Sequence, residues 1–306
     1  MKRNMLILCP LLLVFFFNTS TSFGQEVILN DSIIRFYNLF HKIVELDRDK
    51  DSPESIHKAY LDYFNCGLVP ESVIAKNYSG YADELAAMGD LDKAVVYYDK
   101  AFYSKHLLPS DFNIEGIRKW FSEDTALFQL KVKEYQDNFG KIYSYQELQI
   151  INELYSMLSA DQLSRQYCKQ HPDRSLLMFS DSLTMRRMIA LIQNNASTDN
   201  PLKYVKFAYF VLGRHAYSCY PKMWLQYIEP IERQWLIEGK SDNVSYARNY
   251  DQAIIYATGE KSYFGEFNDY GNAANPDTAT VNRHRINIGL PPLKEKKESN
   301  SIFITY

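Results

Sequence analysis

The sequence predicts an all-α fold, and three observations support this prediction. Glycine and proline are scarce: the 306 residues include 12 glycines and 11 prolines, about 7.5% together against an average of about 12%. Apolar side chains recur at three- and four-residue steps along most of the chain, which is the period of an α-helix. Strand-like alternation occurs only in residues 301–306, which are too isolated to pair by themselves.

The composition is that of a globular protein rather than a disordered chain. Hydrophobic residues make up 46% of the sequence and charged residues 23%, which leaves enough apolar material for a core. The formal net charge is −3. We therefore expect no general attraction to nucleic acid or to an anionic membrane.

The first 24 residues predict a secretory signal peptide. Lys2 and Arg3 precede an apolar run over residues 6–17, and a small polar segment then ends at Gly24. The run is too short for a comfortable membrane span, although an uncleaved anchor is the alternative. No second run of this kind follows. We expect an exported protein, periplasmic or extracellular, without integral membrane association once the peptide is removed.

Helices are expected from residue 28 onward. Apolar residues over 28–47 follow helical spacing. Ser52 followed by Pro53 then supplies an N-cap with proline at the first helical position. Apolar and aromatic residues continue on one face of this second helix as far as Phe64.

Residues 77–102 predict a helical hairpin. Small residues let two antiparallel helices approach, a glycine turns the chain, and a tyrosine fills the space between them; these are Ala82, Gly89, Ala94, Tyr98 and Ala101. In these positions the segment resembles one tetratricopeptide unit. No second clean copy occurs at the period of about 34 residues, so an ordinary helical hairpin is the alternative. We assign residues 25–141 to a tetratricopeptide-like helical region.

A second helical domain is expected over residues 142–295. A helix over 124–139 ends before Gly140, and Ser144 with Glu147 forms a capping box that opens the next one. Further helices are expected over 183–192, 201–215, 223–235 and 246–257, with Pro230 kinking the third of these. Residues 263–282 are rich in loop-forming residues, a short helix should end at Gly289, and residues 296–306 form a charged tail.

Familiar catalytic signatures are absent from the sequence. It contains no Gly-x-Ser-x-Gly, no His-Glu-x-x-His, no phosphate-binding loop and no Gly-x-Gly-x-x-Gly. The six histidines never occur at metal-ligand spacing, so we expect no metal site and no cofactor. Cys66, Cys168 and Cys219 are expected either as three free thiols or with one bridge between the last two.

A scattered polar set in the C-terminal half supplies the candidate catalytic groups. His215 ends an apolar helix and is the candidate general base. Asp251 lies in a helix with apolar neighbours and is its candidate orienting partner, while a buried carboxylate there also needs a partner of its own. For His215, the structural alternative is a hydrogen-bonded core residue.

Arginines and an Asp-Gln-x-x-Arg sequence supply the candidate substrate- or anion-binding groups. Arg283 and Arg285 place two guanidinium groups on one short element, where they could bind a carboxylate or phosphate. Asp161 and Arg165 are four residues apart and should pair on one helix face, beside Gln162. A purely structural clamp on Asp161 or Asp251 is the alternative for these arginines.

The order of these residues resembles an uncharacterised bacterial domain-of-unknown-function family over roughly residues 145–295. The pattern is Asp161-Gln162-x-x-Arg165, Asp181, His215, Asp251 and Arg283-x-Arg285-x-x-x-Gly289-Leu290-x-Pro292-Leu293. The resemblance implies a helical domain, often exported, without an established activity. Two elements depart from the family: residues 194–197 replace a glycine-and-proline turn, and its Tyr-Gly loop is shifted to residues 263–265. A pocket shaped by those elements would be altered here.

Three hypotheses follow from the sequence. The first, which we expect, is an exported helical module that binds a protein partner or small ligand, because catalytic signatures are absent and tyrosine is abundant, with 24 copies. The second is an uncharacterised hydrolase that uses His215, Asp251 and Arg283 or Arg285. The third is a polar core that only holds the helices in register, a role compatible with either of the others.

Overall fold

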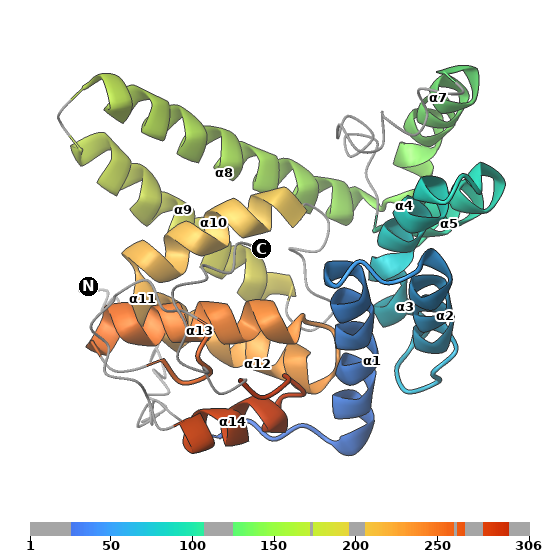
Figure 1. Ribbon diagram of the computed structural model, residues 1–306. Coiled ribbons are helices and arrows are strands. Elements are labelled where there is room, and N and C mark those ends of the chain that lie inside the picture. The colour runs from blue at the N-terminus through green and yellow to red at the C-terminus, as the bar shows by residue number, and fades with distance from the viewer. Residues whose placement is uncertain are drawn as a thin grey trace, which may run out of the picture.

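A computed structural model of the chain confirms the all-α fold (Figure 1). The structure describes residues 26–106, 125–171, 174–195, 206–259, 262–266 and 278–293, and every regular element among them is helical. The predicted signal peptide and the charged tail lie outside the described residues. Among the described helices, none combines the length and the apolar character needed to cross a membrane.

The helices follow one another along the chain in this order. The N-terminal half contains α1 (Asp31–Arg48), α2 (Pro53–Phe64), α3 (Glu71–Ile74), the 3₁₀ turn η1 (Ala75–Asn77), α4 (Tyr78–Ala87), α5 (Leu91–Tyr103) and α7 (Thr125–Ile142). The C-terminal half contains α8 (Tyr145–Gln170), α9 (Ser175–Asn195), α10 (Lys206–Cys219), α11 (Pro221–Met223), the π turn η4 (Trp224–Ile228), α12 (Glu229–Ile237), α13 (Asn243–Thr258) and α14 (Thr278–Asn287).

Local sequence sets several of the helix boundaries. The Ser52 side chain accepts a hydrogen bond from the backbone N–H of Ser55 at the start of α2, as predicted. Ser144 and Glu147 form a reciprocal capping box at the start of α8, also as predicted. Each cap satisfies backbone N–H groups that have no partner inside the helix, and a cap of this kind is worth about 1 kcal/mol.

The α4–α5 hairpin confirms the predicted pair of packed helices. Ala82, Ala94 and Ala101 are buried where the two helices approach, and Gly89 turns the chain with a φ of 82°, which favours glycine. Tyr98 is buried between the helices and donates a hydrogen bond to Asp83 over 2.6 Å. The likeness to a tetratricopeptide unit remains a prediction.

The abundance of tyrosine is partly explained by packing. Fully buried tyrosines line the core from α1 to α13; they are Tyr37, Tyr63, Tyr81, Tyr98, Tyr135 and Tyr246. Many of these rings meet other aromatic rings, as where Phe36 stacks on Tyr63 with ring centroids 5.0 Å apart. Such pairs add stability beyond the area that they bury. Many of the tyrosines that suggested a contact surface therefore belong to the interior.

Helix α1 packs on the C-terminal half of the chain (Figure 1). The Tyr37 hydroxyl donates to the carbonyl of Ser241 over 2.7 Å, and the backbone N–H of Leu29 donates to the carbonyl of Asn287 over 2.9 Å. Gly289 has a φ of 72° and lies so close that a Cβ there would be 3.1 Å from the Cβ of Tyr37. The first helix of the predicted N-terminal region, 25–141, therefore packs against the predicted C-terminal domain, 142–295.

The helix expected around Pro230 is interrupted just before the proline. The expected helix over 223–235 is divided into α11, the π turn η4 and α12, with Pro230 in the first turn of α12. Proline has no N–H to donate to the preceding turn, and a wider π turn accommodates that loss.

Helices α8 and α9 form a long antiparallel hairpin that positions the candidate site (Figure 1). Helix α10 packs against both of them. The far end of the hairpin extends away from the rest of the molecule. Polar side chains from the three helices meet where α10 lies beside the hairpin.

Candidate functional site

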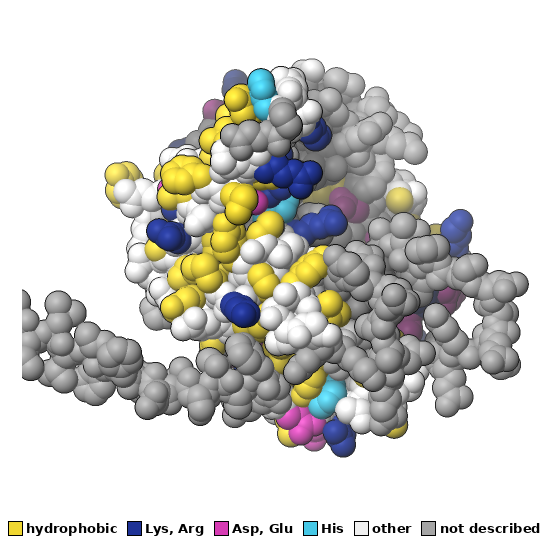
Figure 2. All heavy atoms as spheres, turned by 90° about the vertical axis from the view of Figure 1, so that its left-hand side faces the viewer, with side chains coloured by type: hydrophobic (Ala, Val, Ile, Leu, Met, Phe, Trp, Pro, Cys, Tyr) yellow, Lys and Arg dark blue, Asp and Glu magenta, His cyan; other side chains and the backbone are white. Residues whose placement is uncertain are grey.

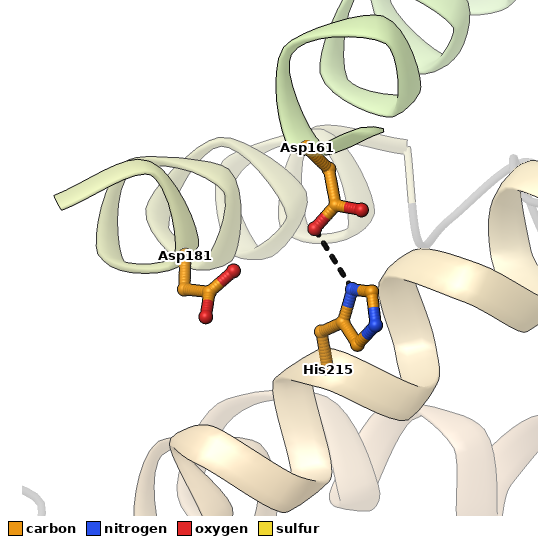
Figure 3. Close-up of side chains that lie close together, drawn as sticks. All are labelled: Asp161, Asp181 and His215. Atoms are coloured by element: carbon orange, nitrogen blue, oxygen red, sulfur yellow. Dashed lines mark hydrogen bonds and ion pairs between the residues drawn. The ribbon is translucent and has the colours of Figure 1, made fainter. Parts of the chain in front are cut away.

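Three helices bring Asp161, Asp181 and His215 together (Figure 3). Asp161 comes from α8, Asp181 from α9 and His215 from α10. The Nδ1 atom of His215 lies 2.8 Å from Oδ1 of Asp161. The Asp161 side chain is 1% exposed, while that of His215 is 22% exposed. A buried carboxylate thus holds a histidine that solvent can reach.

This contact determines what the His215 ring can do. With Nδ1–H donating to Asp161, a neutral ring carries its lone pair on Nε2. Among the described residues, none forms a hydrogen bond with Nε2. An oriented imidazole with an available Nε2 is the arrangement that general-base catalysis requires.

Arg165 connects the two carboxylates. Its Nε atom lies 3.2 Å from both oxygens of Asp161, and its Nη2 atom lies 2.8 Å from Oδ1 of Asp181. The predicted i, i+4 pair of Asp161 and Arg165 is confirmed, and Gln162 also donates to Asp161 over 2.8 Å. Because the guanidinium group is held by these fixed carboxylates, it is occupied as a link between α8 and α9 rather than open to a substrate anion.

The two carboxyl groups have pKa values shifted in opposite directions. Burial alone would raise the pKa of Asp161, but hydrogen bonds from His215 and Arg165 outweigh burial and hold it below its usual value. For Asp181, burial prevails over the attraction of Arg165 and His215, so its pKa is raised. The site therefore combines an ionised carboxylate with one that holds its proton more readily.

Cys219 contacts the same cluster. Cys219 is exposed as a residue, but partial burial of its thiol and the nearby charge of Asp181 raise its pKa to about 11. A thiol with so high a pKa is a poor nucleophile near neutral pH. Cys66, Cys168 and Cys219 are all free of disulfide bonds, so the alternative bridge between the last two is not formed.

Asp251 does not orient His215, and that part of the predicted site is wrong. The fully buried carboxylate accepts hydrogen bonds from the Ser262 hydroxyl and from the backbone N–H groups of Tyr263, Phe264 and Glu266. Burial raises its pKa to about 6, although these donors oppose the shift. Asp251 thus ties the loop 262–266 to α13, and Asp161 holds His215 instead.

The two predicted anion-binding arginines have different surroundings. Arg285 is buried and donates hydrogen bonds to the carbonyls of Phe264 and Pro291. It also donates to the Glu266 carboxylate over 2.6 Å. These partners occupy its guanidinium group, so the predicted paired clamp with Arg283 does not form. Arg283 is 65% exposed and lies 3.8 Å from Glu26, which is a weak surface contact.

Asp161, Asp181 and His215 are also the one group of potential metal ligands found among the described residues. One ligand atom from each lies within 4.8 Å of the others. Sequence spacing could not show this, because the three residues are 20 and 34 positions apart and meet only through helix packing. Arg165 already supplies a positive charge to both carboxylates, so a cation would have to displace its guanidinium group.

Comparison with known proteins adds no relative. No family model, no curated protein and no solved structure matches the chain. The resemblance to a domain-of-unknown-function family over residues 145–295 remains a prediction.

Proposed function

We propose that the protein is an exported hydrolase in which His215 acts as a general base. The single observation that supports this best is the contact between His215 and the buried Asp161, which leaves Nε2 available on a partly exposed ring. Asp161 would orient the imidazole and stabilise its protonated form after proton transfer. Export is inferred from the predicted signal peptide.

The surroundings of His215 favour water as the nucleophile. The Cys219 thiol belongs to the cluster, but its raised pKa makes covalent thiol catalysis unfavourable. A water molecule hydrogen bonded to Nε2 could transfer a proton to the ring while attacking an electrophilic centre of the substrate. Asp181 is the candidate proton donor to a leaving group, because it is the other carboxyl group of the cluster and burial raises its pKa.

The test compares His215→Ala and His215→Asn with the native protein on chromogenic esters, phosphate esters and glycosides. The amide nitrogen of Asn can take the place of Nδ1 and keep the bond to Asp161, but it supplies no base. We expect both variants to lose about 10²–10⁴-fold in kcat/KM on any substrate that the protein hydrolyses. His57→Gln, a change in a histidine of α2 that contacts Tyr81 instead, should leave hydrolysis unchanged.

Two outcomes would overturn this proposal. One is the absence of hydrolysis that depends on His215. The other is full activity in His215→Asn together with a lowered melting temperature in His215→Ala, which would identify His215 as a structural member of the polar cluster.

A divalent cation site at the same residues is the second candidate function, supported by the convergence of three potential ligands. A metal would require both carboxylates to release Arg165. Titration with Zn²⁺ and Mn²⁺ in a calorimeter distinguishes the two proposals. Stoichiometric binding that Asp181→Asn abolishes would favour the metal site.

A further inference from the structure

The far end of the α8–α9 hairpin carries an unusual group of exposed apolar side chains. Figure 2 looks onto this end of the molecule and shows apolar side chains along the face, with Lys and Arg among them. We call the following six residues the hairpin tip: Leu163, Tyr167, Leu176, Met178, Phe179 and Leu183. Leu163, Met178 and Phe179 are each 66–67% exposed. Apolar groups gathered in this way on a soluble surface usually mark a contact site.

The same stretch of sequence has a strong positive bias. Residues 162–228 contain nine lysines and arginines but only three aspartates, within a chain whose net charge is −3. In the described part of this stretch the one carboxylate is Asp181, which is buried and paired with Arg165. Lys169 in α8, Arg174 just before α9 and Arg186 in α9 are exposed.

The apolar side chains at the tip do not form one flat face. Leu176, Phe179 and Leu183 follow each other at three- and four-residue steps on one side of α9. Met178 is two residues from Leu176, about 200° around the helix, and is exposed on the other side. A single rigid protein surface would cover only one of these sides, whereas a fluid apolar layer can surround a projecting end.

We propose that the hairpin tip inserts into the interface of an anionic lipid bilayer. The apolar side chains would enter the boundary between headgroups and acyl chains, and the nearby cations would contact lipid phosphates. The positive charge that matters is local, because charges farther away than about 8 Å are largely screened at physiological ionic strength. The attraction therefore coexists with a negative net charge for the whole chain. This proposal is independent of the proposed hydrolase activity.

The experiment measures binding to vesicles of phosphatidylcholine alone and of phosphatidylcholine with one quarter phosphatidylglycerol. The chain starting at Gln25 is used beside the full chain, because the apolar run at 6–17 could bind lipid by itself. We expect binding to the anionic vesicles that weakens as salt is added. Replacing Lys169 and Arg174 by Gln should lower the partition coefficient by about thirtyfold.

Matched variants distinguish lipid binding by the hairpin tip from nonspecific hydrophobic adsorption. Met178→Ser with Phe179→Ser should lower vesicle binding by at least about tenfold, while Val96→Ser with Leu130→Ser, at exposed positions of α5 and α7, should leave it unchanged. Lys58→Gln with Lys133→Gln, at exposed lysines in α2 and α7, is the charge control. The emission of Phe179→Trp should shift to shorter wavelength on anionic vesicles, and that of Leu130→Trp should not.

Three results would overturn the proposal. They are no partition into anionic vesicles, equal partition into both kinds of vesicle, and tip variants that bind as the native protein does. If an acidic protein displaced the tip from vesicles while Phe179→Trp showed no spectral shift, the tip would be a protein contact instead.

Discussion

Asp161 and Asp181 have the same chemistry but different surroundings, and the difference determines how each responds to pH. Asp161 accepts hydrogen bonds from His215, Arg165 and Gln162, which stabilise its charged form. Asp181 is also buried, but it accepts fewer hydrogen bonds, and burial raises its pKa. A carboxyl group whose pKa is lower in the folded than in the unfolded state stabilises the folded protein at pH values above its unfolded-state pKa. A carboxyl group whose pKa is higher in the folded state stabilises the folded protein at low pH.

We predict that Asp161→Asn and Asp181→Asn change the pH dependence of stability in opposite directions. Asp161 stabilises the folded protein above pH about 4, and this stabilisation disappears as pH falls below that value. As pH is raised from 3 to 5.5, the free energy of unfolding of Asp161→Asn should therefore increase less than that of the native protein. Asp181 stabilises the folded protein below pH about 4, and this stabilisation disappears as pH rises. Over the same interval, the free energy of unfolding of Asp181→Asn should therefore increase more than that of the native protein. Urea unfolding at both pH values measures the difference, and changes of the same sign would contradict the prediction.

At the scale of elements, α13 and α14 are held together through the short loop 262–266. Asp251 in α13 accepts four hydrogen bonds from that loop, and Arg285 in α14 binds its Phe264 carbonyl and its Glu266 side chain. The loop has no regular backbone pairing of its own, so these two side chains satisfy much of its polar backbone. Both residues, predicted as functional, have a structural role here.

We predict that Asp251→Asn lowers the free energy of unfolding by roughly 3–5 kcal/mol, the scale for breaking a buried charged network. An amide nitrogen in place of one carboxylate oxygen would face N–H donors, so at least one buried donor would lose its acceptor. Asp62→Asn, at an exposed position of α2, should change stability by less than about 0.5 kcal/mol. Chemical denaturation of both variants is the measurement, and equal small effects would show that the loop is not held this way.

At the scale of the whole molecule, the two ends of the described chain support each other. Tyr37 in α1 is almost completely buried and reaches Ser241, and Asn243 at the start of α13 contacts His41 in α1 over 3.2 Å. The α1 helix therefore belongs to the packing of the C-terminal half as much as to the N-terminal helices that follow it. We expect the two halves to unfold together.

We predict that Tyr37→Ala destabilises the C-terminal half by about 3–5 kcal/mol, the cost of removing a large buried aromatic side chain. Tryptophan fluorescence reports this, because Trp224 and Trp235 are both buried in that half. Tyr145→Ala, at an exposed position at the start of α8, is the matched control and should have little effect. A native-like transition in Tyr37→Ala would show that the halves are independent.

The sequence by itself determined the helical class and many of the helix boundaries, because these depend on neighbours three or four residues away. Ser52, the Ser144–Glu147 capping box, the Gly89 turn and the Asp161–Arg165 pair all act within one or two helical turns. Which carboxylate meets His215 was decided only by the tertiary structure. Asp161 and Asp251 are 54 and 36 residues from it, and the packing of α8 against α10 selects the more distant one. Helix periodicity records which face of a helix is buried but not which partner buries it, so the site had to be read from the packed structure.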